Sequence, residues 1–562
     1  MYVLNKILFF GFIFCSAQNP YPKNYFAKPL KEKIVLSGTF GELRTNHFHS
    51  GLDIKTNGSV GLNVYSSAAG YVSRIKISHY GYGKALYVTH PNGFTTVYAH
   101  LKKFSKKIEN YVKSKQYQKE TYEIQLFPQK NFIKVEKNEL IAFSGNSGSS
   151  SGPHLHFEIR DSNERPINPM MFGIDVDDKI KPTIYDIFAY PISKKSHING
   201  KTERVKLNLI KIADGEYKTS TINAEGKIGF GIISNDKLDY ANNKNGLVSI
   251  RTFFNKKKKF EANFQRFSFD ESKHINNYID YEYYNLKGKR IQKLFIDDKN
   301  YLSLLEFDKN NGLLNILDSL SSSFLIEVND FNGNKSSIKI PIKYKSINVS
   351  KKPKNNYNYT LVKSKKDTIL GNRKKYVNIY KNTFYKDVNI NFYIKNDTLK
   401  IHKPTIPLLK PIEINFNIEK HNEKDFIFIG RIDNLGKIKY SPTKKRGNFL
   451  KTKTKYLGTY TLGVDKKGPT IKASNFSDLN WISNNKYLKI KIKDDISGIK
   501  NYRATVNGNW ILMEYDPKSN TLTHDFSDGV INSVENIIEL IVTDNVGNSS
   551  KFKSCFFRKI KN

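Results

Sequence analysis

Cysteine is nearly absent from this 562-residue chain, which has only Cys15 and Cys555. Cys15 lies in a predicted N-terminal signal segment, so cleavage would leave Cys555 alone, to which we assign no role, and would exclude an intramolecular disulfide. Long hydrophobic runs are also absent, and no segment after residue 17 approaches the roughly 20 apolar residues that span a bilayer. We therefore predict a protein that is stabilised by burial and has no transmembrane segment after signal cleavage.

Helical patterning is scarce as well. After residue 169 the sequence alternates short β-rich runs with polar turns and contains almost no convincing helix. Hydrophobic residues make up 38% of the chain and aromatic residues 13%, a composition that fits globular domains and favours strands. The length suggests about three or four domains. We expect a mainly β protein.

The first 17 residues have the pattern of a secretory signal peptide. A weak basic start at Lys6 precedes an apolar run over Ile7–Phe14, and Ser16 and Ala17 are small enough for cleavage. Phe14 stands directly before Cys15, where a lipidation site would have a small residue, so we favour simple cleavage. The sequence thus predicts export to the periplasm or cell envelope.

Acidic residues are few relative to basic ones. The chain has 52 Asp and Glu against 92 Lys and Arg, which gives a formal net charge of +40. This charge would favour anionic surfaces such as cell-wall polymers or lipid head groups. The basic residues are dispersed and the chain has an export signal, so we expect no nucleic-acid partner. The simplest interpretation of most of these basic side chains is that they lie on solvated surfaces.

Histidines and one carboxylate form a split set of candidate metal ligands. His49 and Asp53 lie near the N-terminus, and His154 and His156 follow about a hundred residues later. A catalytic zinc takes three protein ligands and keeps one position for water, and this set can supply a carboxylate and two imidazoles. In an extended strand His154 and His156 would share one face while Leu155 points into a core. A zinc hydrolase is therefore the leading interpretation.

Several separated blocks around these residues follow one another in a consistent order. They are Arg44-Thr-Asn-His-Phe-His-Ser-Gly-Leu-Asp-Ile54, Ala69-Gly-Tyr-Val72, Gly81-Tyr-Gly83, Tyr98-Ala-His-Leu101, Ser144-Gly-Asn-Ser-Gly148 and Gly152-Pro-His-Leu-His-Phe-Glu158. Over roughly residues 38–172 they resemble the M23 peptidases, the lysostaphin- and LytM-type zinc endopeptidases that cut peptidoglycan cross-links. A lone His-x-His would be weak evidence, whereas several blocks in family order make chance a poor explanation.

The resemblance implies a division of roles among five residues. His49, Asp53 and His156 would ligate one Zn²⁺ per chain, and His100 and His154 would lie near the metal-bound water and the scissile carbonyl. His100 and His154 are then candidates to deprotonate the water, to stabilise the oxyanion and to protonate the leaving amine. The sequence does not divide these duties between them.

Other residues near the motifs have less specific interpretations. Glu158 could orient an imidazole as an outer-sphere acceptor, but we favour a solvated or core-rim salt bridge. Tyr98 could contact substrate or simply pack. His47, His79 and His90 are interpreted as surface or turn residues.

The domain organisation expected from these patterns begins with a signal peptide and a peptidase domain and continues with accessory β-domains. The expected ranges are signal peptide 1–17, M23-type β-sheet peptidase domain 18–175, β-sandwich-like domain 176–347, an uncertain β-rich domain 348–464 and an Ig-like β-sandwich 465–562. Residues 18–37 are expected to be a linker and a first strand. An insertion over about 102–134 should contain a short helix, because Phe104–Ser114 has helical spacing and Ser105 could be its N-cap.

A weak internal repeat supports the accessory β-domains. Asp178–Ile184 resembles Asp465–Ile471, and Val328–Ser337 resembles Val542–Ser550. Each pair would open and close one sandwich.

The function expected from the sequence is that of an exported zinc metalloendopeptidase that hydrolyses peptide bonds in peptidoglycan stem-peptide cross-links. The alternative is a non-catalytic M23-like scaffold that binds the wall or regulates another hydrolase, and a third class is a protease of secreted proteins. The complete set of ligand positions favours the enzyme. The later β-domains are expected to bind the cell wall or a protein partner and to supply no catalytic group, so a fragment ending near Gly173 should fold and cleave small muropeptides.

Overall fold

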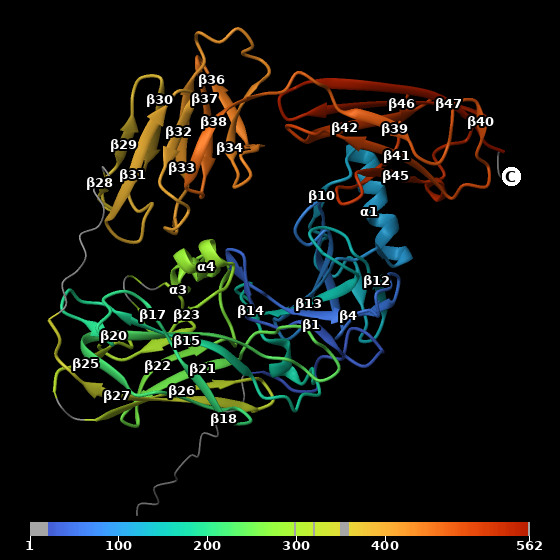
Figure 1. Ribbon diagram of the computed structural model, residues 1–562. Coiled ribbons are helices and arrows are strands. Elements are labelled where there is room, and N and C mark those ends of the chain that lie inside the picture. The colour runs from blue at the N-terminus through green and yellow to red at the C-terminus, as the bar shows by residue number, and fades with distance from the viewer. Residues whose placement is uncertain (1–20, 297–298, 300, 319–320, 349–358, 560–562) are drawn as a thin grey trace, which may run out of the picture.

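The computed structural model describes residues 21–559 except 297–298, 300, 319–320 and 349–358, so the predicted signal peptide 1–17 lies outside the described residues. Nearly all regular structure in the described residues is strand, which confirms the mainly β fold predicted from the sequence. Four β-rich regions follow one another along the chain (Figure 1), and we refer to them as the N-terminal region (21–175), the second region (176–347), the third region (359–464) and the C-terminal region (465–559).

The N-terminal region is built on a nine-stranded sheet of order β1-β4-β13-β8-β7-β6-β10, with β11 beside β6 and β14 beside β13. Its strands are β1 (Leu36–Gly38), β4 (Leu52–Lys55), β6 (Gly70–Ile77), β7 (Lys84–Thr89), β8 (Thr95–Ala99), β10 (Ile124–Leu126), β11 (Lys134–Val135), β13 (His154–Arg160) and β14 (Pro166–Ile167). The hairpin β7–β8 turns at Gly93, whose φ is 84°. Asn92-Gly93 is a dipeptide typical of tight hairpin turns.

Smaller elements complete the N-terminal region. They are the hairpin β2 (Leu43–Arg44) and β3 (His47–Phe48), the sheet of β5 (Asn63–Tyr65), β12 (Leu140–Phe143) and β9 (Lys103–Phe104), the helix α1 (Lys106–Lys119) and the 3₁₀ turn η1 (Pro169–Phe172). Ser105 is the N-cap of α1, as predicted, although its side chain makes no capping hydrogen bond. The helix buries Ile108, Val112 and Gln116 and continues past Ser114.

The segment before β1 is part of the core, unlike the linker that we expected. Phe26, Leu30 and Ile34 are buried, and the Phe26 ring lies 5.4 Å from the ring of Phe172 and 5.3 Å from that of His90. These apolar residues have neither helical nor strand periodicity, so their burial could not be inferred from pattern alone.

The second region holds a 13-stranded sheet whose main order is β17-β15-β20-β27-β26-β21-β22-β24. Its strands are β15 (Thr183–Pro191), β16 (His197–Ile198), β17 (Val205–Leu207), β18 (Leu209–Ala213), β19 (Glu216–Thr219), β20 (Ile222–Asn235), β21 (Ser249–Phe254), β22 (Lys257–Asn263), β23 (Gln292–Lys293), β24 (Leu305–Phe307), β25 (Leu314–Ile316), β26 (Ser322–Asn329) and β27 (Lys335–Tyr344). Three short helices, α2 (Phe269–Ser272), α3 (Ile275–Tyr278) and α4 (Tyr281–Lys287), were missed from the sequence because each is too short to show helical periodicity.

The N-terminal and second regions share one hydrophobic core. Phe40 and Phe48 of the first are almost fully buried, and their rings lie 5.0 and 5.5 Å from the ring of Phe267 in the second. Phe48 also contacts Phe264, with ring centroids 5.9 Å apart. Its backbone N–H donates to Ser272 Oγ at 2.8 Å. Apolar burial of this kind makes the two regions stabilise each other.

The third and C-terminal regions each pair two sheets around a core of their own. The third region contains β28 (Tyr359–Val362), β31 (Val388–Lys395), β32 (Thr398–Ile401), β38 (Gly458–Val464), β34 (Ile427–Ile432) and β35 (Ile438–Tyr440) in one sheet and β29 (Thr368–Gly371), β30 (Lys375–Ile379), β33 (Ile412–Asn417), β37 (Phe449–Thr454) and β36 (Thr443–Arg446) in the other. The C-terminal region contains β39 (Thr470–Ala473), β41 (Tyr487–Lys493), β45 (Thr521–Asp525) and β44 (Glu514–Asp516) in one sheet and β40 (Asn480–Trp481), β47 (Ser549–Phe557), β46 (Glu535–Asp544), β42 (Ile499–Val506) and β43 (Asn509–Trp510) in the other, with the 3₁₀ turn η2 (Phe526–Asp528).

The C-terminal region folds back onto the N-terminal region and lies against α1 (Figure 1). The rings of Tyr117 and Trp510 are 5.3 Å apart, and Lys113 forms an ion pair with Asp528. Among the described residues, no helix has both the length and the apolar character needed to cross a bilayer.

Candidate metal centre

Strand register brings the candidate ligands together. Asp53 in β4 lies directly opposite His156 in the antiparallel strand β13. Paired residues of antiparallel strands have side chains on the same face, so these two side chains meet. His49 lies just before β4, where its backbone pairs with Gly41 and Glu42 at 2.9 Å each. Leu155 is fully buried on the opposite face of β13, as its alternation with the histidines predicted.

Three ligand atoms converge on one point. His49 Nε2 lies 3.0 Å from Asp53 Oδ1 and 3.1 Å from His156 Nδ1, and His156 Nδ1 lies 2.9 Å from Asp53 Oδ1. The three side chains are buried. Arg44 Nη2 binds the other carboxylate oxygen, Asp53 Oδ2, at 3.0 Å. Asp53 therefore presents Oδ1 to the two imidazoles.

Outer hydrogen bonds fix the tautomers of both imidazoles. His49 Nδ1 lies 2.7 Å from the carbonyl oxygen of Thr39, and His156 Nε2 lies 2.8 Å from Glu158 Oε1. Neither acceptor has a proton to donate, so each of these nitrogens carries the hydrogen. When the rings are neutral, the opposite nitrogens direct lone pairs toward Asp53 Oδ1, which is the arrangement of metal-binding histidines.

The tautomers of His100 and His154 are fixed in the same way, by hydrogen bonds to backbone carbonyls. His100 Nδ1 donates to the carbonyl of Ser147 at 2.9 Å, and His154 Nδ1 donates to the carbonyl of Gly152 at 2.9 Å. His154 Nε2 lies 3.3 Å from Asp53 Oδ1, and the rings of His100 and His154 are 4.8 Å apart. His100 directly follows β8 and has a φ of 58°, a left-handed conformation that few residues adopt. The structure thus brings all five predicted site residues into one cluster.

The electrostatics of the cluster favour positive charge at its centre. The pKa of Asp53 lies well below its usual range, because the charge of His49 and hydrogen bonds from His154 and His156 outweigh its burial. Burial alone would lower the pKa of His156, but hydrogen bonds to Asp53 and Glu158 raise it to about 9. Positive charge is therefore favoured at the centre. Imidazole nitrogens and one carboxylate oxygen are donors that suit Zn²⁺, so the residues present fit this ion.

Glu158 has a different environment from the one we favoured. It is fully buried, accepts from His156 through Oε1, and accepts from Arg160 Nε through Oε2 at 2.6 Å. Ser50 Oγ and the hydroxyl of Tyr82 also donate to Oε1. The expected salt bridge is present, with Arg160, but its expected position at the solvated or core-rim surface was wrong, because the sheet face that carries His156 is covered at this point. Glu158 orients the imidazole of His156.

The histidines that were interpreted as surface or turn residues, and Tyr98, lie outside the cluster. Tyr98 is fully buried and its hydroxyl accepts from Ser67 N at 2.8 Å, so it packs in the core. His47 is exposed, and its Nδ1 donates to its neighbour Thr45. His90 is buried, binds the carbonyl of Ala69 at 2.9 Å and has a pKa lowered by burial to about 4. His79 packs on Tyr122, with ring centroids 5.2 Å apart.

The loop over residues 145–150 supports the cluster from one side. It supplies the Ser147 carbonyl that holds His100, and Ser150 Oγ lies 3.1 Å from His154 Nδ1. Gly148 has a φ of 70°, and a Cβ there would come within 2.3 Å of Gly83 N, so only glycine fits. Lys518 of the C-terminal region donates to the carbonyl oxygens of Asn146 and, at 3.2 Å, of Ser150. A distant region therefore contacts the loop that positions His100 and His154.

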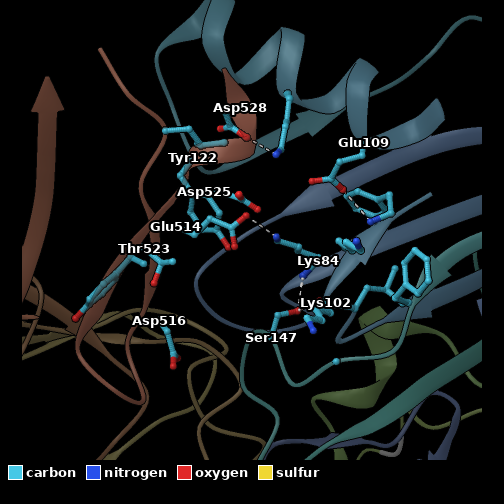
Figure 2. A pocket seen from close by; sticks show the side chains of 18 of the residues that line it. Lys84, Lys102, Glu109, Tyr122, Ser147, Glu514, Asp516, Thr523, Asp525 and Asp528 are labelled. Carbon is cyan, nitrogen blue, oxygen red and sulfur yellow. Dashed lines mark hydrogen bonds and ion pairs between the residues drawn. The ribbon is translucent and has the colours of Figure 1, made fainter. Parts of the chain in front are cut away.

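A charged cavity of about 1140 Å³ is lined by residues of this loop, of α1 and of the C-terminal region. Figure 2 shows Lys84 pointing toward Glu514, and Lys113 forms an ion pair with Asp528 in the same cavity. Lys84 Nζ lies 2.7 Å from Glu514 Oε1, and Tyr117 donates to Asp528 at 2.8 Å. The cavity wall includes Ser147 but not His49, Asp53 or His156, so the cavity lies beside the metal centre.

Sequence reasoning missed Thr39, Arg44 and Glu42 as parts of the site. Glu42 Oε2 binds Arg44 at 2.7 Å, and its Oε1 accepts from Thr39 N at 2.9 Å. Burial raises the pKa of Glu42, and Arg44 opposes that shift. Arg44 stands at the head of the first motif block, which was the only available signal.

Comparisons with known proteins match the part of the chain that carries the five residues of the cluster. The model of peptidase family M23 matches residues 47–117 and 129–169, and the model of the Zu5-like domain matches residues 359–465. The chain is 34% identical over 132 residues to the DD-carboxypeptidase/endopeptidase Mpg of Neisseria meningitidis, which covers 24% of each chain. It is 30% identical over 154 residues to an uncharacterized metalloprotease of Haemophilus influenzae, which covers 26% of this chain and 27% of the relative.

Among solved structures, the catalytic domain of lysostaphin from Staphylococcus simulans is 22% identical, with a TM-score of 0.18, and the match covers 24% of this chain and 87% of that domain. The chain spans about a quarter of the length of the curated relatives that it matches. The family match breaks between residues 117 and 129, a shorter interval than the expected insertion at 102–134.

Proposed function

We propose, from the M23 peptidase domain that this chain contains around residues 47–169, that the protein is an exported zinc metalloendopeptidase that cleaves stem-peptide cross-links in peptidoglycan. One observation carries the proposal. Four imidazoles, those of His49, His100, His154 and His156, each donate one N–H to an outer acceptor. The other nitrogens of His49, His154 and His156 all lie within 3.3 Å of Asp53 Oδ1. A non-catalytic scaffold has no need of this arrangement.

His49, Asp53 and His156 would hold the zinc ion. A bound zinc supplies Lewis acidity and a water of lowered pKa. Thr39 and Glu158 keep the two imidazoles in the tautomers that leave a nitrogen for the metal, and Arg44 keeps Asp53 turned toward it. These contacts pre-organise the ligands before substrate arrives.

His100 and His154 are placed to handle protons. With Nδ1 of each ring donating to a carbonyl, Nε2 is the atom left to accept a proton from the attacking water or to return one to the leaving amine. Burial and the neighbouring imidazoles lower the pKa of His100 to about 3, so this ring is neutral at physiological pH. With its hydrogen on Nδ1, the neutral ring presents the lone pair of Nε2, which can accept a proton or a hydrogen bond from the attacking water.

The proposal is tested by digestion of purified peptidoglycan with and without a chelator. We expect the full chain to release muropeptides with new free amino groups, the chelator to stop the release, and added Zn²⁺ to restore it. Release unaffected by chelation would contradict the metal-dependent mechanism. Cleavage of casein but not of peptidoglycan would favour a protease of secreted proteins, and inactivity of the zinc-loaded chain toward both would favour the scaffold.

Replacement of His154 or His100 by alanine should separate metal binding from chemistry. We expect each variant to keep its zinc and to lose about 10²-fold or more in turnover, because proton transfer and oxyanion stabilisation are each worth about that much. Zinc content and muropeptide release rate are the measurements. His47→Ala is the matched control and should behave as wild type, because its ring lies at the surface outside the cluster. A wild-type rate in His154→Ala would remove that residue from the mechanism.

A further inference from the structure

Three buried aspartates meet where the chain passes from the N-terminal region into the second region. Asp178 precedes β15, Asp236 follows β20 and Asp330 follows β26. Each is less than a tenth exposed, and one carboxylate oxygen from each lies within 4.8 Å of the others. Three carboxylates this close together repel one another unless a cation or protons lie between them.

Two of these carboxylates have oxygen atoms without a partner. Asp178 Oδ2 and Asp236 Oδ1 are buried and accept no hydrogen bond. No lysine, arginine or histidine in the described part of the chain forms an ion pair with any of the three aspartates. Burial, reinforced by the neighbouring carboxylates, raises the pKa of Asp178 to about 7 and that of Asp236 to about 8. Unpaired buried carboxylates are costly, so the protein alone leaves this cluster incomplete.

A fourth side chain beside the cluster is also unpartnered. Asn245 pairs with Asp236 in an isolated antiparallel bridge, so the two side chains lie on the same face. Asn245 is 2% exposed, and neither its amide oxygen nor its amide nitrogen has a hydrogen-bond partner. A buried amide normally has its partners, so its oxygen is available to a ligand at Asp236.

The C-terminal region contains a similar cluster that the protein itself completes. Asp465 and Asp544 occupy the repeat positions of Asp178 and Asp330, and with Asp494 they also lie within 4.8 Å of one another. In this cluster the carboxylate oxygens accept hydrogen bonds from backbone N–H groups. Asp544 Oδ1 accepts from the N–H groups of residues 546, 547 and 548 at 2.9, 2.7 and 2.9 Å, and Asp465 Oδ2 accepts from that of residue 497 at 3.1 Å. None of these three aspartates has an unpartnered buried oxygen among the described residues.

We propose that Asp178, Asp236 and Asp330, together with the amide oxygen of Asn245, bind a divalent calcium ion. The donor set consists of oxygens alone, which hard cations prefer and which zinc does not require. Three carboxylates more than balance the double charge of the ion, and water completes the six to eight ligands that calcium accepts. Asp330 also accepts hydrogen bonds from Asn334 at 2.8 and 2.7 Å, as Asp544 does from the turn after it, so the two clusters differ at Asp178, Asp236 and Asn245. Because the counterpart at Asp465, Asp494 and Asp544 has no such unpartnered buried oxygen in the part of the chain that the structure describes, we expect it to bind no calcium.

This calcium site would fix the junction between two regions. It joins the segment that leaves the N-terminal region at Asp178 to the loop that carries Asp236 and Asn245. Gly246, next in the chain, donates its N–H to Thr39 Oγ1 at 2.9 Å, and the carbonyl of Thr39 accepts from His49. The loop held by calcium therefore supports the residue that orients a ligand of the candidate zinc centre.

Calorimetric titration of the zinc-loaded full chain with calcium chloride tests the proposal. We expect one calcium per chain in the wild type and none in Asp236→Asn, an isosteric change that removes one ligand charge without removing the side chain. Asp494→Asn is the matched control in the other cluster and should bind calcium as the wild type does. Absence of binding by the wild type at about 10 mM Ca²⁺, ten times the weakest constants of extracellular calcium modules, would overturn the proposal.

Thermal unfolding with and without calcium gives an independent readout. At a calcium concentration 100 times the dissociation constant, the unfolding midpoint of the two regions that share a core should rise by about 4 °C. Asp236→Asn should show no calcium-dependent rise, and in a chelator at neutral pH it should unfold close to the wild-type midpoint, because burial already favours the uncharged form of Asp236. A calcium-dependent rise of the same size in Asp236→Asn would overturn the assignment of this residue.

Discussion

Replacement of His156 by alanine should abolish zinc binding and reduce peptidoglycan cleavage by at least about 10³-fold, since a catalytic metal contributes several kcal/mol to the transition state. His156 lies at the centre of the cluster, 2.9 Å from Asp53 Oδ1 and 3.1 Å from His49 Nε2. His49→Ala and Asp53→Ala should have the same effect. Zinc content by atomic spectroscopy and the release rate of muropeptides are the measurements.

A milder substitution distinguishes the loss of a zinc ligand from the loss of the residue that orients it. Glu158→Gln removes the charge of the acceptor that orients His156, and we expect zinc affinity to fall by about 10- to 100-fold without being abolished. Circular dichroism should show that the β-rich fold persists in all of these variants. Full zinc occupancy in a folded His156→Ala protein would show that the ligands have been misassigned.

A fragment that ends near Gly173 should fail to fold stably, which is the opposite of our expectation from the sequence. Phe40 and Phe48 are buried against Phe264 and Phe267, so the truncation would expose both. Exposure of two phenylalanine side chains costs about 3–6 kcal/mol, a large share of the 5–15 kcal/mol that typically stabilises a protein. We expect the fragment to aggregate or to unfold without cooperativity in a thermal scan.

The matched control is a fragment that ends at Lys345. It retains both halves of the shared core and should unfold cooperatively and bind zinc. It lacks Lys518, which contacts the carbonyl oxygens of Asn146 and Ser150. A turnover lower than that of the full chain at equal zinc content would therefore indicate that the C-terminal region supports the loop beside His100. Equal unfolding midpoints for the two fragments would contradict the shared-core argument.

The sequence by itself determined the mainly β fold and the residues of the candidate zinc centre. Alternation in β13 places His154 and His156 on one face because side chains of a strand alternate, and this local rule needs no tertiary information. The family blocks identified His49, Asp53 and His100 without showing how they meet. The repeat also marked Asp178 and Asp330, although only as positions that open and close a β-domain.

The tertiary structure decided how distant segments meet. Register across β4 and β13 set Asp53 against His156, and the covered sheet face turned Glu158 from an expected salt bridge at the surface into a buried partner of His156. The shared core, the return of the C-terminal region to α1 and the meeting of Asp236 with Asn245 depend on how sheets pack and how loops cross between them. Periodicity reports only which face of an element is apolar, so contacts between residues far apart in the chain are fixed by packing alone.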